Sequence, residues 1–397
     1  MAGALDGIRV LEAGDLVSAA YATKLLADLG ADVVKIERPG TGDRTRQRGP
    51  FPGGVPHLEQ SGSFLYLNAN KRGITLDLTT AAGRDALGRL AARTDVLVHN
   101  VHPDDMAAHG LDWERLAAAN PGLVMTSIAP FGLTGPHAHW RATDVVTWAA
   151  GGLATLNGDT GHPELPPLKT FGDQSGFQGG LNAAIASLGA LYGRLSSGLG
   201  EHIEVSIQEC VASILELTFG FWPYTGLVAS RLGAKPLQPL CFMECRDGWI
   251  FVCCVEEHQW RSFVELMGSP EWAGMDLFAN RIARGKNFDA LQLFLQEWCR
   301  EQSVYDLYEQ AQARRIPFAP VSTMGDLLRS PHLQARGFFA TIRHPVAGNV
   351  TVPGEPYKLS ATPWQLRTPA PCLGQHTPEV LAEVGLDAAA LAAQGVC

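Results

Sequence analysis

Positive charge and long apolar runs are both scarce in this sequence. Lys plus Arg total 31 against 40 for Asp plus Glu, so the formal net charge is −9. Proteins that bind nucleic acid non-specifically usually carry a basic surface, and this balance disfavours that class. No apolar run approaches the ~20 residues that a membrane-spanning helix needs. The N-terminal sequence MAGALDGIRVLEAG has no basic segment followed by an apolar one. We therefore expect no signal peptide, no membrane partner and a cytoplasmic protein.

Metal and disulfide signatures are missing as well. None of the 8 cysteines forms a C-x-x-C pair, and the 12 histidines are scattered along the chain. Cys241 and Cys245 are close in sequence, but no second pair accompanies them. We therefore expect reduced thiols and no metal ion.

The sequence also lacks two common phosphate-binding motifs. A dinucleotide site would need G-x-G-x-x-G after the first strand, and that turn reads EAGDLVSAA, with Gly14 alone. No P-loop is present either. This favours an α/β sheet that binds something other than a dinucleotide.

Strand and helix patterns alternate over residues 1–135. The composition, 46% hydrophobic and 18% charged, is that of a globular chain, and 397 residues suggest two or three domains. Apolar segments predict strands at 8–11, 31–37, 74–78, 95–99 and 123–128. Helical periodicity is found at 19–29, 81–92 and 113–118. Strands and helices in this order predict a parallel α/β sheet covered on both faces.

The pattern changes after residue 150. A Gly- and Pro-rich stretch covers 151–180, and turn-rich residues at 230–239 suggest a linker. The remaining elements that we expect are helices at 177–195, 210–221, 257–267, 288–301, 304–314 and 387–394, a strand at 203–207, a hairpin around Asp247-Gly248, and antiparallel strands within 341–359.

Four arginines follow the predicted strand 31–37, namely Arg38, Arg44, Arg46 and Arg48. Ligands bind at the carboxyl ends of strands in α/β sheets, and guanidinium groups suit phosphates. A solvated loop without a specific partner is the alternative.

Asp173 lies in the segment KTFGDQSGFQGG, just before the predicted helix 177–195. A carboxylate on a Gly-rich turn at a helix N-terminus is accessible and stays ionised. The other interpretation is that Asp173 caps the helix, which is common for Asp, and the two roles are compatible.

An ordered set of motifs resembles the family III CoA-transferases, which include formyl-CoA transferase and carnitine CoA-transferase and are related to α-methylacyl-CoA racemase. The motifs are LDGIRVLE at 5–12, LLADLGADVVKIERPGTGD at 25–43, NANKRGITLDL at 68–78, DVLVHNVHP at 95–103, NPGLVMTSIAPFGLTGP at 120–136 and LGQHTPEVL at 373–381.

The resemblance implies an interlocked homodimer of α/β chains. Each chain would have a large Rossmann-like, CoA-binding domain from residues 1–229, to which residues 339–397 return. Residues 230–338 would form a smaller α+β domain.

The resemblance also implies a nucleophile and a reaction. Asp173, in Gly172-Asp173-Gln174-Ser175-Gly176, matches the family aspartate, although the second glycine comes one residue early. It would move CoA from an acyl-CoA to a free carboxylic acid through an aspartyl anhydride and an aspartyl-CoA thioester, without a prosthetic group. The flanking glycines are candidate amide donors to the oxyanion.

CoA contacts carry over position by position. They are Val17, Ser18, Arg38, Leu76, Asp77, Leu78, Thr79, Asn100, Val101, His102, Arg141 and Asp144. The sequence departs from the family pattern where Ala19-Ala20 replaces Gly-Pro and where His102 and Ala108 replace arginines. A poly-glycine segment is missing between Gly233 and Gly248, which argues against formyl-CoA and oxalate as substrates.

Two alternatives stay open. A racemase of this superfamily would need a His before Asp144 as one of two bases, and Thr143 stands there, although His137 and His139 are nearby. A non-catalytic acyl-CoA-binding relative would have no need of Asp173.

Overall fold

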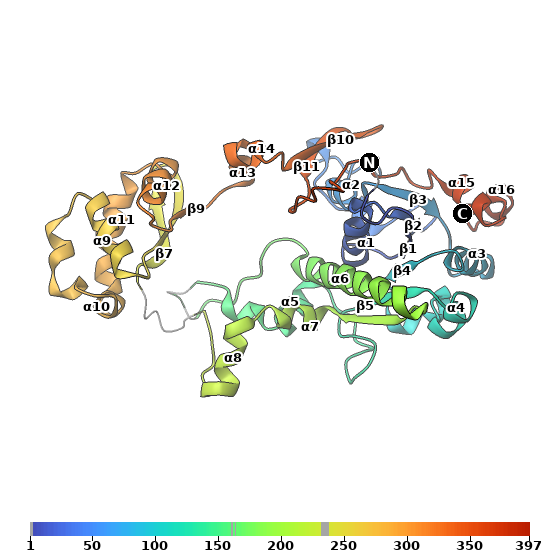
Figure 1. Ribbon diagram of the computed structural model, residues 1–397, viewed down its shortest axis with the longest axis horizontal. Helices are drawn as coiled ribbons and strands as arrows, with labels where there is room; N and C mark the ends of the chain where they lie inside the picture. Colours follow the sequence, from blue (N-terminus) through green and yellow to red (C-terminus); the bar gives the residue numbers. More distant parts are fainter. Residues whose placement is uncertain (1–2, 160–161, 163, 232–237) are drawn as a thin grey trace. The chain divides into compact units, whose positions relative to one another are not determined.

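The computed structural model describes residues 3–159, 162, 164–231 and 238–397 (Figure 1). The chain divides into two compact units. The larger consists of Met1–Arg231 and Gly337–Cys397, and the smaller of Leu232–Arg336. Of the linker expected at 230–239, residues 232–237 lie outside the described part of the chain.

A six-stranded parallel sheet forms the centre of the larger unit. Its order is β3-β2-β1-β4-β5-β6. The strands are β1 (Arg9–Ala13), β2 (Asp32–Glu37), β3 (Lys71–Thr75), β4 (Val96–His99), β5 (Val124–Ala129) and β6 (His202–Ser206). This is the doubly wound order, in which the connections from β1 and β4 run in opposite directions. A crevice therefore opens at the carboxyl ends of these two central strands.

Alternate residues of the strands build two separate cores. Val10, Val33 and Val98 pack against α1 (Ser18–Asp28) and α6 (Gln174–Ser197). On the other face, Leu11, Ile36 and Leu97 belong to the core formed with α3 (Ala81–Ala91), α4 (Trp113–Ala119), α15 (Thr377–Glu383) and α16 (Ala388–Ala392). The remaining helices of this unit are α2 (Gly62–Asn68), α5 (Asp144–Ala150), α7 (Ile207–Ser213) and α8 (Glu216–Thr225).

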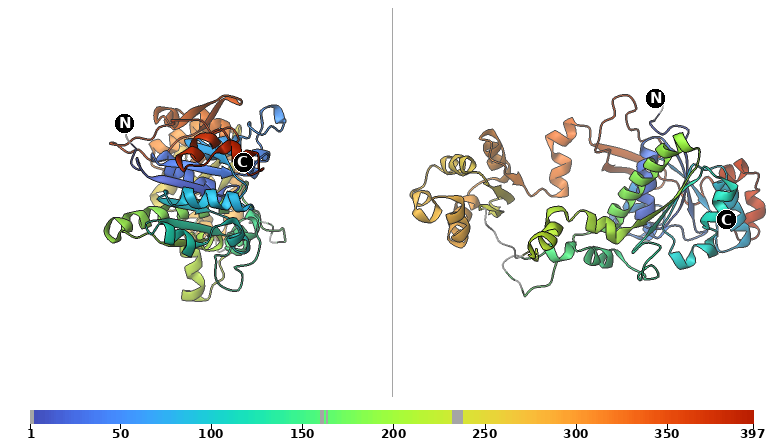
Figure 2. Two further views of the ribbon diagram at one scale, coloured as in Figure 1. Left: turned by 90° about the vertical axis from the view of Figure 1, so that its right-hand side faces the viewer. Right: turned by 60° about the horizontal axis from the view of Figure 1, so that its bottom comes forward.

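Small residues let α1 and α6 lie side by side (Figure 2). A Cβ atom on Gly180 would come within 2.6 Å of the carbonyl oxygen of Ser18. Only glycine permits this approach, which brings the N-terminal ends of the two helices together.

The chain returns to the larger unit after residue 336. The hairpin of β10 (Phe339–His344) and β11 (Gly348–Pro353) comes first, and then α15 packs beside β3. The amide of Gly73 donates to Nδ1 of His376, and the amide of Thr75 donates to Oγ1 of Thr377. The tail thus completes the edge of the sheet.

Three predicted elements differ from the structure. The strand predicted at 74–78 is β3, which ends at Thr75; the chain then turns, and the Asp77 amide donates to the carbonyl of Val396. Leu76 and Leu78 are buried outside any strand, so their alternation mimicked one. The single helix predicted at 210–221 is wrong, because α7 ends before Glu216, whose φ is 36°. Helix α6 begins at Gln174, earlier than predicted.

The smaller unit is built on the predicted hairpin. Strands β7 (Leu240–Cys245) and β8 (Gly248–Cys253) pair antiparallel, and β9 (Ala319–Pro320) joins β8. Met243, Phe263, Leu295 and Phe318 lie in its core. Its helices are α9 (Glu257–Leu266), α10 (Arg281–Lys286), α11 (Phe288–Arg300), α12 (Val304–Ala313), α13 (Met324–Arg329) and α14 (Pro331–Ala335). In the part of the chain that the structure describes, no helix is both long and apolar enough to cross a membrane.

Candidate active site

A cavity of about 490 Å³ lies at the carboxyl ends of β1, β4 and β5 in the larger unit. Its walls come from the loop after β1, the residue after β4, the end of β5 and the N-terminal ends of α5, α6 and α7. This is the place where the strand order reverses, as the doubly wound topology predicts for a ligand site.

Asn100 fixes the loop after β1. Its Oδ1 accepts from the amide of Asp15 at 2.8 Å, and its Nδ2 donates to the Asp15 carbonyl at 2.6 Å and to Oγ of Ser18 at 2.9 Å. A Cβ atom on Gly14 would lie 2.3 Å from that of Ala19, so glycine is needed for this close turn. One side chain at the end of β4 thereby shapes the wall contributed by β1.

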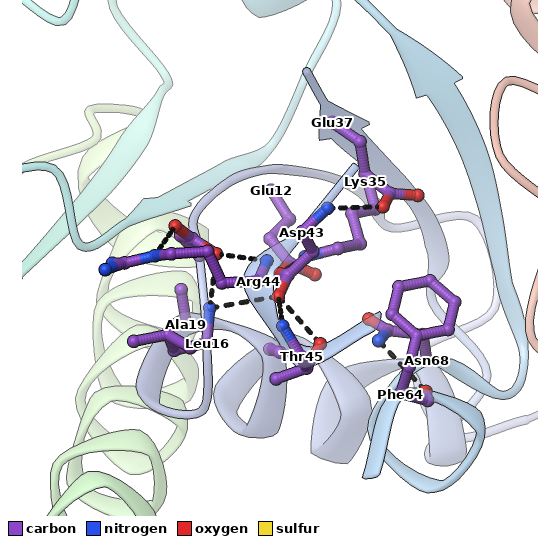
Figure 3. A network of polar contacts seen from close by, with 12 residues as sticks. Glu12, Leu16, Ala19, Lys35, Glu37, Asp43, Arg44, Thr45, Phe64 and Asn68 are labelled. Carbon is purple, nitrogen blue, oxygen red and sulfur yellow. Dashed lines mark hydrogen bonds and ion pairs between the residues drawn. The ribbon is translucent and has the colours of Figure 1, made fainter. Parts of the chain in front are cut away.

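Buried charges lie beneath this loop (Figure 3). Lys35 pairs with Glu12 at 2.6 Å and with Asp43 at 2.7 Å, all three side chains being fully buried. Burial lowers the pKa of Lys35, but the two carboxylates raise it by more, so the pKa lies above its ordinary value and the ammonium stays charged. Asp43 also accepts from the amide of Leu16 at 3.2 Å, and Leu16 adopts a left-handed φ of 62°. The buried charges hold the cavity loop in a conformation that a leucine rarely adopts.

The four arginines of the loop after β2 have different surroundings. Arg46 is buried in ion pairs with Glu37 at 2.7 Å and Glu59 at 2.6 Å, which leaves it no access to a ligand phosphate. Arg44 lies in the cavity wall, paired with Asp15 at 2.5 Å. Arg38 is exposed at the end of β2, outside the cavity wall.

Arg48 and Asp173 meet in the cavity. Nη1 of Arg48 lies 2.7 Å from Oδ2 of Asp173, and the two side chains are 48% and 34% exposed. A loop after β2 and the start of α6 are thus joined by an ion pair that solvent can reach. The sequence put Arg48 among candidate phosphate ligands; the structure puts it beside the candidate nucleophile.

Asp173 occupies the N-cap position of α6, but its side chain does not cap the helix. Asp144 does so instead: its Oδ1 accepts from the amides of Ser175 at 2.8 Å and Gly176 at 3.1 Å. The capping interpretation of Asp173 is therefore wrong. The Gly176 amide, a candidate oxyanion donor from the sequence, is already used by Asp144.

Lys169 holds this arrangement together. Its Nζ lies 2.7 Å from Oδ2 of Asp144 and also donates to the carbonyl of Gly172. Gly172 has a φ of 83°, which glycine tolerates and which turns the chain into α6. The role of Lys169 could not be inferred from sequence patterns, because its partner Asp144 is distant along the chain.

The cavity unites some of the candidate CoA contacts and not others. Val17, Ser18, Asn100 and Asp144 line it together with Asp173. The residues that do not line it are Arg38, Leu76, Asp77, Leu78, Thr79, Val101, His102 and Arg141. Of these, Leu76 and Leu78 have side chains buried in the core.

The two histidines near Asp144 also lie outside the cavity wall. His137 stacks on the ring of Trp140 at 3.8 Å, and His139 pairs with Asp104. Arg141 pairs with Asp105 at 3.1 Å. These side chains are engaged with surface neighbours and not with Asp173.

Comparison with known proteins agrees with this geometry. A family model described as CoA-transferase family III matches residues 5–377. The chain belongs to this family. Among its relatives, the succinyl-CoA:(R)-benzylsuccinate CoA-transferase subunit BbsE of Thauera aromatica is 33% identical, with 93% of this chain and 91% of that protein covered. A formyl-CoA:oxalate CoA-transferase of Streptomyces avermitilis is 33% identical, with 97% of each chain covered.

A solved structure has the same fold. The crystal structure of a CaiB/BaiF family protein from Brucella suis superimposes with a TM-score of 0.88 at 30% identity, covering 97% of this chain and 100% of that one. The family recognised from sequence motifs and the α/β fold with its parallel sheet are both confirmed. This protein is a family III CoA-transferase.

Proposed function

We propose that this family III CoA-transferase moves CoA from an acyl-CoA thioester to a free carboxylic acid through covalent intermediates on Asp173. The position of Asp173 carries the proposal. Asp173 is a half-exposed carboxylate in the cavity where the strand order reverses. Its oxygens are available for chemistry because Asp144 caps α6.

The chemistry runs through four displacements at acyl carbons. An Asp173 oxygen attacks the donor thioester, the C–S bond breaks, and an anhydride and CoA thiolate result. The thiolate attacks Cγ of Asp173, which releases the donor acid as its carboxylate and leaves an aspartyl-CoA thioester. The acceptor carboxylate then displaces the thiolate, and the thiolate attacks the acceptor acyl carbon and releases the Asp173 carboxylate. The thioester energy is conserved throughout.

Trapping the covalent intermediate tests this function. Hydroxylamine should convert the activated Asp173 of the wild-type protein, incubated with succinyl-CoA, into a hydroxamate that peptide mass spectrometry locates. Asp173→Asn is the matched control and should stay unmodified. Modification at another carboxylate would refute the assignment, and a non-catalytic acyl-CoA binder would give none.

CoA binding is the second part of the proposal. We infer that the residues after β1, β2, β3 and β4 contact CoA, with Arg38 at the 3′-phosphate. Its exposure at a strand end and the charge-assisted bond that a guanidinium makes to phosphate support this. Arg38→Ala should weaken binding of CoA more than that of dephospho-CoA in calorimetry. Equal losses would move Arg38 to another part of the ligand.

A homodimer is the third part. Helices α6 and α8 expose large apolar side chains, among them Tyr192, Leu195, Phe219 and Trp222. Phe171, two residues before Asp173, is 99% exposed. Apolar surface of this extent marks an interface, and we propose a second copy as its partner. If the chains interlock, light scattering should show a dimer even at nanomolar concentration; a folded monomer there would refute interlocking.

The racemase alternative receives no support from the cavity. The two-base proton exchange of that branch would need a histidine facing the substrate as one of its bases. No histidine is found among the described residues that line the cavity, and Thr143 precedes Asp144.

A further inference from the structure

We propose that the guanidinium of Arg48, which pairs with Asp173 in the free protein, binds the carboxylate of the reacting acid once Asp173 is acylated. The inference rests on the covalent chemistry at Asp173 proposed above. It assigns to Arg48 the recognition of the reacting acid, a role separate from CoA binding.

The charges of the cavity wall are balanced in pairs. Arg44 pairs with Asp15 at 2.5 Å, Lys169 with Asp144 at 2.7 Å and Arg48 with Asp173 at 2.7 Å. The described wall thus contains three cations and three carboxylates.

Acylation breaks this balance at one place. When an Asp173 oxygen forms a bond to an acyl carbon, the carboxylate becomes a neutral anhydride, and later a neutral thioester. Asp15 and Asp144 take no part in the chemistry, so Arg44 and Lys169 keep their partners. Arg48 alone of the three cations loses the charge that it faces.

The side chain of Arg48 is free to accept a replacement. Among the described residues, Asp173 alone accepts a hydrogen bond from the guanidinium of Arg48. Its backbone is fixed, because the amide donates to the carbonyl of Thr45 at 3.0 Å and the carbonyl accepts from Ser61 at 2.6 Å. A half-exposed guanidinium on a fixed backbone has further N–H groups that can bind a carboxylate in a bidentate geometry.

The reaction supplies a carboxylate at this moment. Attack of CoA thiolate on Cγ of Asp173 expels the donor acid as an anion, and the acceptor enters as an anion to attack the same carbon. Each forms or breaks a bond at a carbon whose oxygen lies 2.7 Å from Nη1 of Arg48 in the free protein. Arg48 can therefore hold one oxygen of the acid while the other faces Cγ, and orientation of this kind lowers the barrier.

Binding of small acids to a neutral form of the site tests the inference without turnover. Asp173→Asn removes the charge, as acylation does, and leaves Arg48 unpaired. We expect acetate and oxalate to bind this variant at least tenfold more tightly than the wild type, measured by NMR titration. The gain should vanish in Asp173→Asn/Arg48→Gln and persist in the matched control Asp173→Asn/Arg44→Gln.

The outcomes are distinct. No gain in Asp173→Asn, or a gain that survives Arg48→Gln, would overturn the assignment. A gain for oxalate without one for acetate would also overturn it, because Arg48 would then read a second carboxylate. None of these results depends on whether Asp173 is the nucleophile, which hydroxylamine trapping decides separately.

A kinetic readout separates binding from folding. Arg48→Gln should raise the KM for the acceptor acid at least tenfold while the KM for the acyl-CoA changes less than threefold, and Arg48→Lys should recover part of the loss. Equal rises in both constants would contradict a role in acid recognition. Circular dichroism of each variant excludes misfolding as the cause.

Discussion

The larger unit contains two sets of ion pairs a short distance apart, and they differ in burial and in the number of partners. Beneath the loop after β1, Lys35 is fully buried and contacts both Glu12 and Asp43. In the cavity wall above, the side chains of Arg48 and Asp173 are half-exposed and form an ion pair with each other. Buried charges with several partners fix the backbone, because losing one partner leaves another charge unsolvated. Exposed pairs are weak and exchange partners readily. The fold therefore places permanent pairs under the site and an exchangeable pair, Arg48–Asp173, within it.

Removing the proposed nucleophile tests the exchangeable pair and should have the largest effect. Asp173→Ala is expected to lower the transfer rate by ~10⁴ or more, because a covalent route is lost. The same change should alter the free energy of unfolding by at most about 1 kcal/mol, since the pair with Arg48 is half-exposed. Steady-state assays and denaturant titrations measure the two. Residual activity within about tenfold of wild type corresponds to only ~1.4 kcal/mol of barrier and would contradict the assignment.

Breaking the permanent set should show the opposite pattern. Lys35→Met leaves Glu12 and Asp43 buried with one fewer cation, and we expect a loss of about 3–5 kcal/mol in the free energy of unfolding. The control Arg89→Met removes an exposed pair with Asp85 and should cost less than about 1 kcal/mol. Equal losses in the two variants would remove the distinction between the two sets.

The pH dependence of stability tests a different buried group, the imidazole of His99. Burial lowers the pKa of His99 to about 3, and its Nε2 lies 2.6 Å from Oγ of Ser127. In the unfolded chain His99 binds a proton near pH 6.5, whereas in the folded chain it stays neutral until about pH 3. The free energy of unfolding therefore falls as the pH drops below 6.5. Between pH 6.5 and 5 we expect a loss of up to ~1.4 kcal/mol per pH unit.

His99→Asn isolates this contribution. Burial also lowers the pKa of His202, so part of the slope should remain in the variant. Denaturant titrations at pH 6.5, 5.75 and 5 compare the two proteins. An unchanged slope would mean that His99 is protonated in the folded state.

The smallest effect is expected from the other arginine of the cavity wall. Arg44 is exposed and its pair with Asp15 involves a loop already fixed by Asn100. Arg44→Gln should change the free energy of unfolding by less than about 1 kcal/mol. A loss comparable to that of Lys35→Met would show that exposure is a poor guide to the strength of these pairs.

Local sequence patterns were sufficient for most of the sheet and for the family. Apolar segments located β1, β2, β4 and β5 to within one or two residues. A parallel strand that is buried on both faces needs a nearly continuous run of apolar residues, and such a run is easily found in a sequence. The pattern was misleading at Leu76 and Leu78, which follow the end of β3 and are buried in the core that also contains Val380, Leu381 and Leu391 of the C-terminal tail.

The site was harder to predict than the sheet. Asp173 could be singled out from its glycines, but its freedom from capping depends on Asp144, which approaches through the tertiary fold. Arg48 and Arg46 are both arginines of one loop, and only packing decides that one reaches the cavity while the other is buried. Sequence spacing carries no information on such partners when they are distant along the chain.

The tail that completes the sheet edge has a consequence for biosynthesis. Val380, Leu381 and Leu391 belong to the core over one face of the sheet, and Val396 accepts from the amide of Asp77. Ribosomes deliver these residues long after β3 has emerged. The part of that face beside β3 therefore lacks its cover until α15 and α16 have been synthesised, and a chaperone has most reason to bind the growing protein there.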